Sequence, residues 1–147
     1  MTRSPGASLR LLVAAATVAL LMASGSAVLA ESPRTGELHV IKECSQYNRL
    51  PGGFCTITAS NINGIKVGSR VVYASAPANG VLDSDITVVR NGNSVAYGHV
   101  TLAFGAGSGT LTLSGGTGKF AGFSATVVVT HPGQWAWNGT YEFSPPD

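Results

Sequence analysis

The sequence is poor in charge, in aromatic side chains and in cysteine. Only 11% of its 147 residues are charged and 7% are aromatic, and there are two cysteines. Two of the nine Lys and Arg residues, Arg3 and Arg10, lie in the first ten positions, so the rest of the chain balances seven basic against seven acidic residues. A neutral domain lacks the basic surface that binds nucleic acid or an anionic membrane. We therefore expect no nucleic-acid partner.

Long apolar runs are missing except near the N-terminus. Residues 11–22 form an apolar stretch that follows a basic segment and precedes small residues up to Ala30. This order is typical of a secretory signal peptide, here residues 1–30. Removing 30 residues from 147 leaves 117, enough for one domain. No remaining run approaches the roughly 20 residues that span a bilayer, so we expect a secreted, extracellular protein with no membrane partner after cleavage.

Familiar catalytic and cofactor motifs are also missing. There is no Gly-x-Ser-x-Gly nucleophile motif, and the glycine-rich residues 115–119 lack the spacing of a phosphate-binding loop. His39, His99 and His131 are far apart in the sequence and do not suggest a metal site. We expect no metal and no cofactor, and the sequence leaves any catalytic residue unknown.

The two cysteines, Cys44 and Cys55, have ten residues between them. An even count in an exported chain favours a disulfide. Zinc binding is the alternative, but two cysteines without a nearby histidine pair make a poor zinc site. The enclosed segment contains the turn sequence Pro51-Gly52-Gly53. Closing a loop of this size stabilises the fold by roughly 3 kcal/mol in the loop-entropy model.

Glycine, by contrast, is abundant, with 19 residues, and the chain is rich in Thr and Val. This composition disfavours helices and favours strands. After a loose lead-in at residues 31–37, turn signals divide the chain into eight expected strands: 38–42, 55–60, 70–76, 81–90, 94–104, 110–114, 120–130 and 135–143. We predict an all-β domain over residues 38–147, either an eight-stranded antiparallel β-barrel or a sandwich. Such a barrel is wide enough to be filled by side chains or to hold one small ligand in an apolar lumen.

Alternation along the strands places aromatic residues with polar tips on shared faces. Tyr97 and His99 share one face of their strand, and Trp137 and Tyr141 share one face of the last strand. With Tyr73, they form our candidate ligand-binding set, because a mostly apolar lining with a few polar groups is typical of a small-molecule pocket. The alternative is that these aromatic side chains fill the core. The pattern does not decide which face of each strand lies inside.

Asp83 and Asp85 also lie on one strand face. If buried together, they would supply an acid and a base with separated pKa values. Alternatively, they are the solvated shoulder of a hairpin. His99 and Tyr97 could polarise an epoxide or carbonyl oxygen, or His99 could simply be bonded to a neighbour.

The second half of the chain carries a more specific pattern. Gly98-His99-Val100, followed by the segment GTLTLSGGTGKFAGF from Gly109 to Phe123, resembles a signature shared by allene oxide cyclases and dirigent proteins. The Val67-Gly68 pair resembles the start of an early cyclase strand, so the resemblance covers residues 65–143. It implies an eight-stranded barrel with an apolar lumen open at one end. It also implies a cofactor-free cyclase or isomerase, or a dirigent-like guide for phenolic intermediates, and leaves a homo-oligomer open.

Two functions follow from these observations. The first is a secreted barrel that binds an apolar or phenolic small molecule in its lumen, with or without turnover. The second is a secreted structural or protein-interaction domain whose barrel is packed and holds no ligand.

Overall fold

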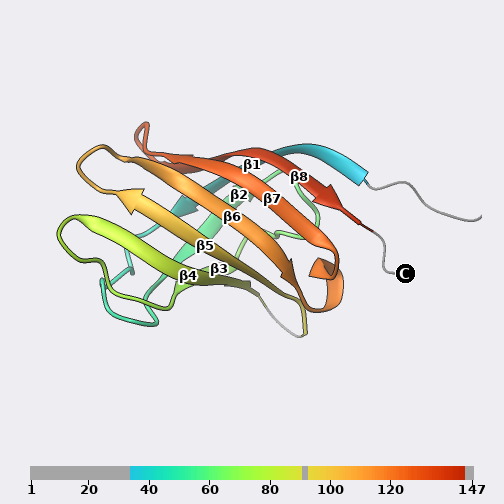
Figure 1. The fold of residues 1–147 in the computed structure, drawn as a ribbon, viewed down its shortest axis with the longest axis horizontal. Coiled ribbons are helices and arrows are strands. Elements are labelled where there is room, and N and C mark those ends of the chain that lie inside the picture. The colour runs from blue at the N-terminus through green and yellow to red at the C-terminus, as the bar shows by residue number, and fades with distance from the viewer. Residues whose placement is uncertain (1–33, 91–92, 145–147) are drawn as a thin grey trace, which may run out of the picture. The chain divides into compact units, whose positions relative to one another are not determined.

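The computed structural model describes residues 34–90 and 93–144, which form eight strands and one short 3-10 helix (Figure 1). The elements are β1 (Arg34–Glu43), β2 (Phe54–Ser60), β3 (Arg70–Tyr73), β4 (Val81–Val89), β5 (Val95–Ala103), β6 (Ser108–Gly116), η1 (Gly118–Phe120), β7 (Phe123–Thr130) and β8 (Trp135–Phe143).

Each strand pairs antiparallel with the next one in the sequence, and β1 pairs with β8 to close the barrel. The two closing strands lie side by side in Figure 1. The prediction of an all-β, eight-stranded antiparallel barrel is confirmed, and the sandwich is excluded. In the described structure every strand therefore has a partner on both sides over at least part of its length, which limits the sheet edge open to another chain. Within the described ranges, no helix is both long enough and apolar enough to cross a membrane.

The first strand begins earlier than predicted. Residues 34–37, expected as part of a loose lead-in, belong to β1, where Arg34 lies opposite Phe143 and Glu37 opposite Thr140. The ladder with β8 gives their backbone groups hydrogen-bond partners, which outweighs the polar, turn-like composition that suggested a loop. The expected signal peptide, residues 1–30, lies outside the described residues.

The glycine-rich turn also differs from its prediction. The strand expected from Phe120 begins at Phe123, because η1 and a left-handed Gly122 (φ 79°) intervene. A Cβ at Gly122 would lie only 2.0 Å from the carbonyl oxygen of Ser144, so the chain can pass here only without a side chain. The turn directs Phe120 into the core, where it is 3% exposed.

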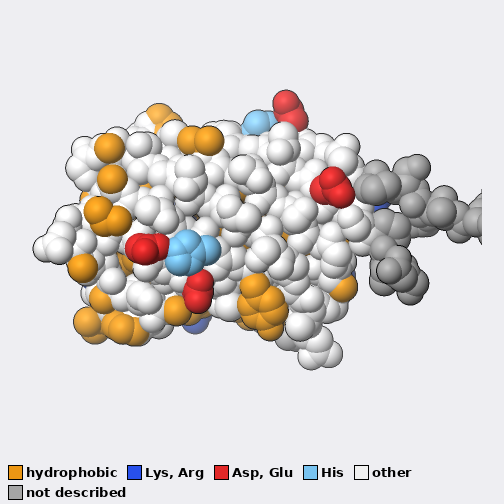
Figure 2. Space-filling model, viewed as in Figure 1, with side chains coloured by type: hydrophobic (Ala, Val, Ile, Leu, Met, Phe, Trp, Pro, Cys, Tyr) orange, Lys and Arg blue, Asp and Glu red, His pale blue; other side chains and the backbone are white. Residues whose placement is uncertain are grey.

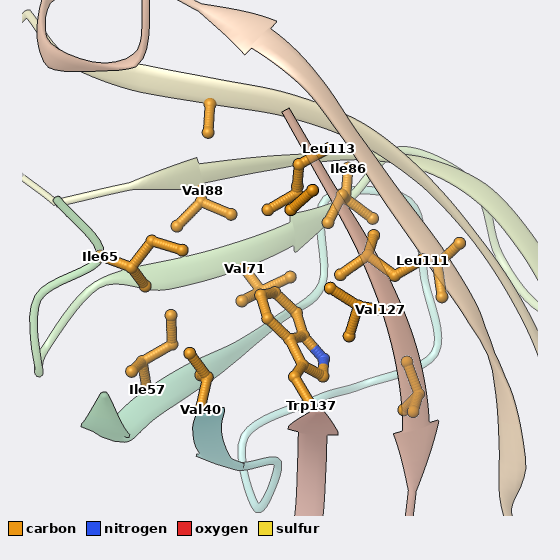
Figure 3. Close-up of a cluster of buried hydrophobic side chains, with 14 of the residues drawn as sticks. Val40, Ile57, Ile65, Val71, Ile86, Val88, Leu111, Leu113, Val127 and Trp137 are labelled. Atoms are coloured by element: carbon orange, nitrogen blue, oxygen red, sulfur yellow. The ribbon is translucent and has the colours of Figure 1, made fainter. Parts of the chain in front are cut away.

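The barrel interior is filled by aliphatic side chains around one large ring. Trp137 is 2% exposed and lies among Val40, Val71 and Val127, contributed by β1, β3 and β7 (Figure 3). The other largest fully buried side chains come from five of the strands and from the loop after β2: Phe123, Leu38, Ile57, Ile65, Leu82, Leu111, Leu113 and Val88. Trp137 is therefore a central packing residue of the barrel.

Replacing Trp137 by alanine should destabilise the fold strongly, because it removes the largest buried side chain and leaves a cavity. We expect the free energy of unfolding to fall by about 3–5 kcal/mol, measured by denaturant unfolding. Tyr97→Ala is the control, since Tyr97 is 47% exposed and should change stability by less than about 1 kcal/mol. Similar losses for the two variants would contradict this account of the core.

Candidate ligand site

The five residues predicted to bind ligand do not form one site. Tyr73 and Trp137 are buried in the interior, at 3% and 2% exposure, and Tyr141 packs against the core from the same side. Tyr97 and His99 instead lie on the outer face, where Tyr97 is 47% exposed and the His99 side chain 51%. The structure thus divides the set between the two faces of the barrel wall.

The reason for the division is the alternation along β5. Ala96, Val100 and Leu102 of this strand are buried, so the residues between them point outward. Gly98 is also required at its inward position, because a Cβ there would approach the Thr112 carbonyl oxygen to 2.5 Å. The face of β5 that carries Ala96, Val100 and Leu102 is more continuously apolar than the face that carries Tyr97 and His99. The more apolar face is therefore the buried one.

On the outer face, His99 lies between Asp83 and Asp85 of the neighbouring strand. Its Nδ1 is 2.8 Å from Asp85 Oδ1, and its Nε2 is 2.5 Å from Asp83 Oδ1. These hydrogen bonds, the one to Asp85 first, raise the pKa of His99. Figure 2 shows a histidine flanked by acidic side chains on a face that otherwise carries little charge. Because both ring nitrogens are engaged, His99 has no free nitrogen with which to polarise a substrate oxygen.

The other candidate ligands for a metal are also dispersed. His39 bonds to Asn138 and Glu37 on the outer face, and His131 packs on the ring of Trp135. Across residues 34–90 and 93–144, no three His, Cys, Asp or Glu side chains come together in a way that could hold a metal ion.

One end of the barrel is closed by the disulfide. Cys44 and Cys55 are bonded, as predicted. Beneath them lies Lys42, only 4% exposed, with Nζ 3.9 Å from each sulfur. Its amine donates a hydrogen bond of 2.5 Å to the Tyr73 hydroxyl. The rings of Tyr73 and Trp135 lie 5.2 and 5.5 Å from the same nitrogen.

Burial shifts the pKa values of both Lys42 and Tyr73. Removal from water lowers the pKa of Lys42 to about 7 and raises the pKa of Tyr73. Lys42 is not among the residues predicted from the sequence, although a signal for its burial is present: it continues the alternation of the buried Leu38 and Val40 along β1. With so little exposure, the amine of Lys42 cannot contact a ligand from solvent in this structure.

The opposite end of the barrel carries a cavity with aromatic and cationic residues in its lining. We call it the mouth pocket. It has a volume of about 650 Å³ and is lined by Arg34, Asn61, Ile62, Asn63, Gly64, Lys66, Lys119, Tyr141 and Phe143. A smaller cavity of about 340 Å³, lined in part by Ser69, Arg90, Ser94 and Phe120, adjoins it, and the two share Gly64, Lys66 and Lys119.

Aromatic rings form the floor of the mouth pocket. Tyr141 and Phe143 are partly exposed there, and both pack on the buried ring of Phe123, at centroid distances of 6.1 and 5.0 Å. Phe120 contacts the other side of Phe123 at 5.6 Å. The guanidinium of Arg34 lies 5.0 Å above the Phe143 ring. The pocket therefore combines an apolar, aromatic floor with a polar and cationic rim.

Two further hollows lie along the barrel wall. One, of about 520 Å³, is lined largely by hydroxyl side chains, including Thr112, Thr126 and Thr140. The other, of about 420 Å³, includes Tyr97 and His99 in its lining. Neither contains two aromatic side chains that also pack on the core, which distinguishes them from the mouth pocket.

The buried amine gives a testable dependence of stability on pH. The pKa of Lys42 in the folded protein lies below its ordinary value of 10.5. Between about pH 7 and 10 the unfolded chain therefore binds more protons, so the free energy of unfolding should rise with pH. Lys42→Met should remove most of this rise, measured by urea unfolding from pH 7 to about 9.5, below the titration of tyrosine.

Lys66→Met is the matched control, because Lys66 is exposed and its replacement should leave the slope unchanged. If the Lys42→Met variant kept the full rise of the parent protein, the amine would not be the titrating group.

Comparison of the chain with family models, curated proteins and solved structures finds no match in any of the three.

Proposed function

We propose that this chain is an exported small-molecule-binding barrel that holds an apolar or phenolic ligand in the mouth pocket. The observation that carries the proposal is the pair of partly exposed rings, Tyr141 and Phe143, at the floor of a cavity of about 650 Å³. This volume lies within the range of roughly 300–1,000 Å³ typical of small-molecule sites. The disulfide is consistent with an extracellular protein.

The position of the ligand differs from the lumen site expected from the sequence. The middle of the barrel is occupied by Trp137 and its aliphatic neighbours. A ligand in the mouth pocket would instead rest on the last layer of the core, against Tyr141 and Phe143. Such a site needs no displacement of buried side chains.

Binding and orientation, rather than turnover, fit the lining. Among the described residues, neither a carboxylate nor an imidazole lines the mouth pocket, so general acid–base catalysis has no evident group there. A rigid aromatic floor can still orient a reactive molecule, which is the role of a dirigent-like guide or of a cyclase that acts by confinement. The resemblance of residues 65–143 to those families supports this class by analogy of fold only.

The filled interior favours a second candidate function. A barrel with a packed core can serve as a secreted structural or protein-interaction domain, and its ends would then contact another protein. The two functions differ in whether the mouth pocket binds a small molecule at all.

Native mass spectrometry of the secreted protein distinguishes them. We expect a 1:1 complex with a phenolic or apolar compound, either co-purified or formed from a panel of phenolics, polyenes and fatty-acid epoxides. Tyr141→Ala should weaken binding about tenfold, equivalent to 1.4 kcal/mol, because it removes half of the aromatic floor. Tyr97→Ala, on the outer face, should bind as the parent does.

Circular dichroism would confirm that both variants are folded. A bare polypeptide mass with every compound would overturn the small-molecule proposal and leave the protein-interaction domain. The same spectra report whether the chain forms a homo-oligomer.

A further inference from the structure

The charges of the barrel are distributed unevenly. Seven Lys and Arg side chains lie in the described residues, and four of them line the mouth pocket and the cavity that adjoins it: Arg34, Lys66, Arg90 and Lys119. We call these four the cationic rim. None of the acidic residues that the structure describes lines either cavity. The chain as a whole is close to neutral. The excess of positive charge is therefore confined to this part of the surface, and the overall composition does not reveal it.

Within residues 34–90 and 93–144, the rim residues form no ion pair with a carboxylate. All four are exposed, and the ion pairs found among the described residues all involve His39 or His99 instead. The nearest acidic residue in sequence to the pocket floor, Glu142, points to the outer face of β8 and accepts a hydrogen bond of 3.1 Å from Ser144 Oγ. The rim is therefore a group of cations whose charge is uncompensated within the described structure.

Rim and floor together specify a ligand with two parts. Lys66 and Lys119 line both cavities, and ammonium groups donate charge-assisted hydrogen bonds to an anionic group. Tyr141 and Phe143 offer ring surfaces on which a flat apolar body can pack. Asn61 and Asn63 add neutral polar groups at the edge.

We propose that the mouth pocket binds an aromatic carboxylate, with the carboxylate at Lys66 and Lys119 and the ring over Tyr141 and Phe143. This inference rests on the proposed function, since it names the ligand class of the same pocket. It makes a stricter claim, however, because a neutral phenolic compound would satisfy the proposed function and not this inference.

The test is a calorimetric titration of the mature, disulfide-bonded protein at neutral pH with four probes: 4-hydroxycinnamate, the neutral 4-hydroxycinnamyl alcohol, decanoate and inorganic phosphate. We expect the aromatic carboxylate to bind about tenfold more tightly than the alcohol, a preference that two exposed ion pairs can supply. Raising the salt concentration should reduce this preference.

Variants test whether Lys66 and Lys119 cause the preference for the carboxylate over the alcohol. The double variant Lys66→Gln/Lys119→Gln should bind acid and alcohol about equally, because it keeps the aromatic floor and loses the charges. Arg49→Gln/Arg70→Gln is the matched control, since it also removes two positive charges: Arg49 lies over Phe104 and Arg70 over Phe54, and neither lines either cavity. The control should keep the preference for the acid.

Four results would overturn the inference. Equal binding of acid and alcohol by the parent protein would overturn it and leave the proposed function intact. Tighter binding of phosphate would reveal a simple anion site, and tighter binding of decanoate would exclude the aromatic body. If no probe bound, the inference would fail for this ligand class, and failure of the wider compound panel as well would remove the proposed function.

Discussion

The hydrogen-bonded ladder between β1 and β8 closes the sheet, and the rest of the structure depends on that closure. The ladder runs from Arg34 opposite Phe143 to Lys42 opposite Trp135. Eight strands fix a barrel whose interior is just wide enough for side chains to fill. Here they do fill it: Trp137 occupies the middle, and the aliphatic residues of the neighbouring strands surround it. Recognition of any other molecule must therefore use the ends or the outer wall.

The two ends place the same type of residue in opposite environments. At the disulfide end, Lys42 is sealed under the Cys44–Cys55 bridge, and burial lowers its pKa to about 7. At the other end, Lys66 and Lys119 are exposed at the edge of a cavity. A buried amine relieves its desolvation cost by losing its proton, whereas an exposed ammonium remains available to an anion. Of these three lysines, only Lys66 and Lys119 can attract an anion from solution.

The sequence allowed the architecture to be predicted because strand and turn signals are local. Turn residues marked the ends of the strands, and two cysteines in a chain expected to be exported indicated the bond between Cys44 and Cys55. The candidate site was less predictable. Tyr97 and His99 looked like pocket residues, but alternation defines two faces without saying which one is buried, and the apolar residues of β5 decided it. The cationic rim gathers residues as distant as Arg34 and Lys119, whose proximity only the closed barrel creates.

The aromatic cluster connects the packed core to the mouth pocket. Phe123 is 1% exposed, and its ring contacts Tyr141 and Phe143, whose other surfaces line the cavity. The floor of the pocket is thus anchored to the interior and to the last residues of β8, rather than carried on a loop. A ligand that packs on such a floor does not have to order it, so less binding energy is lost to conformational entropy. The filled interior is what makes the floor of the mouth pocket a rigid binding surface.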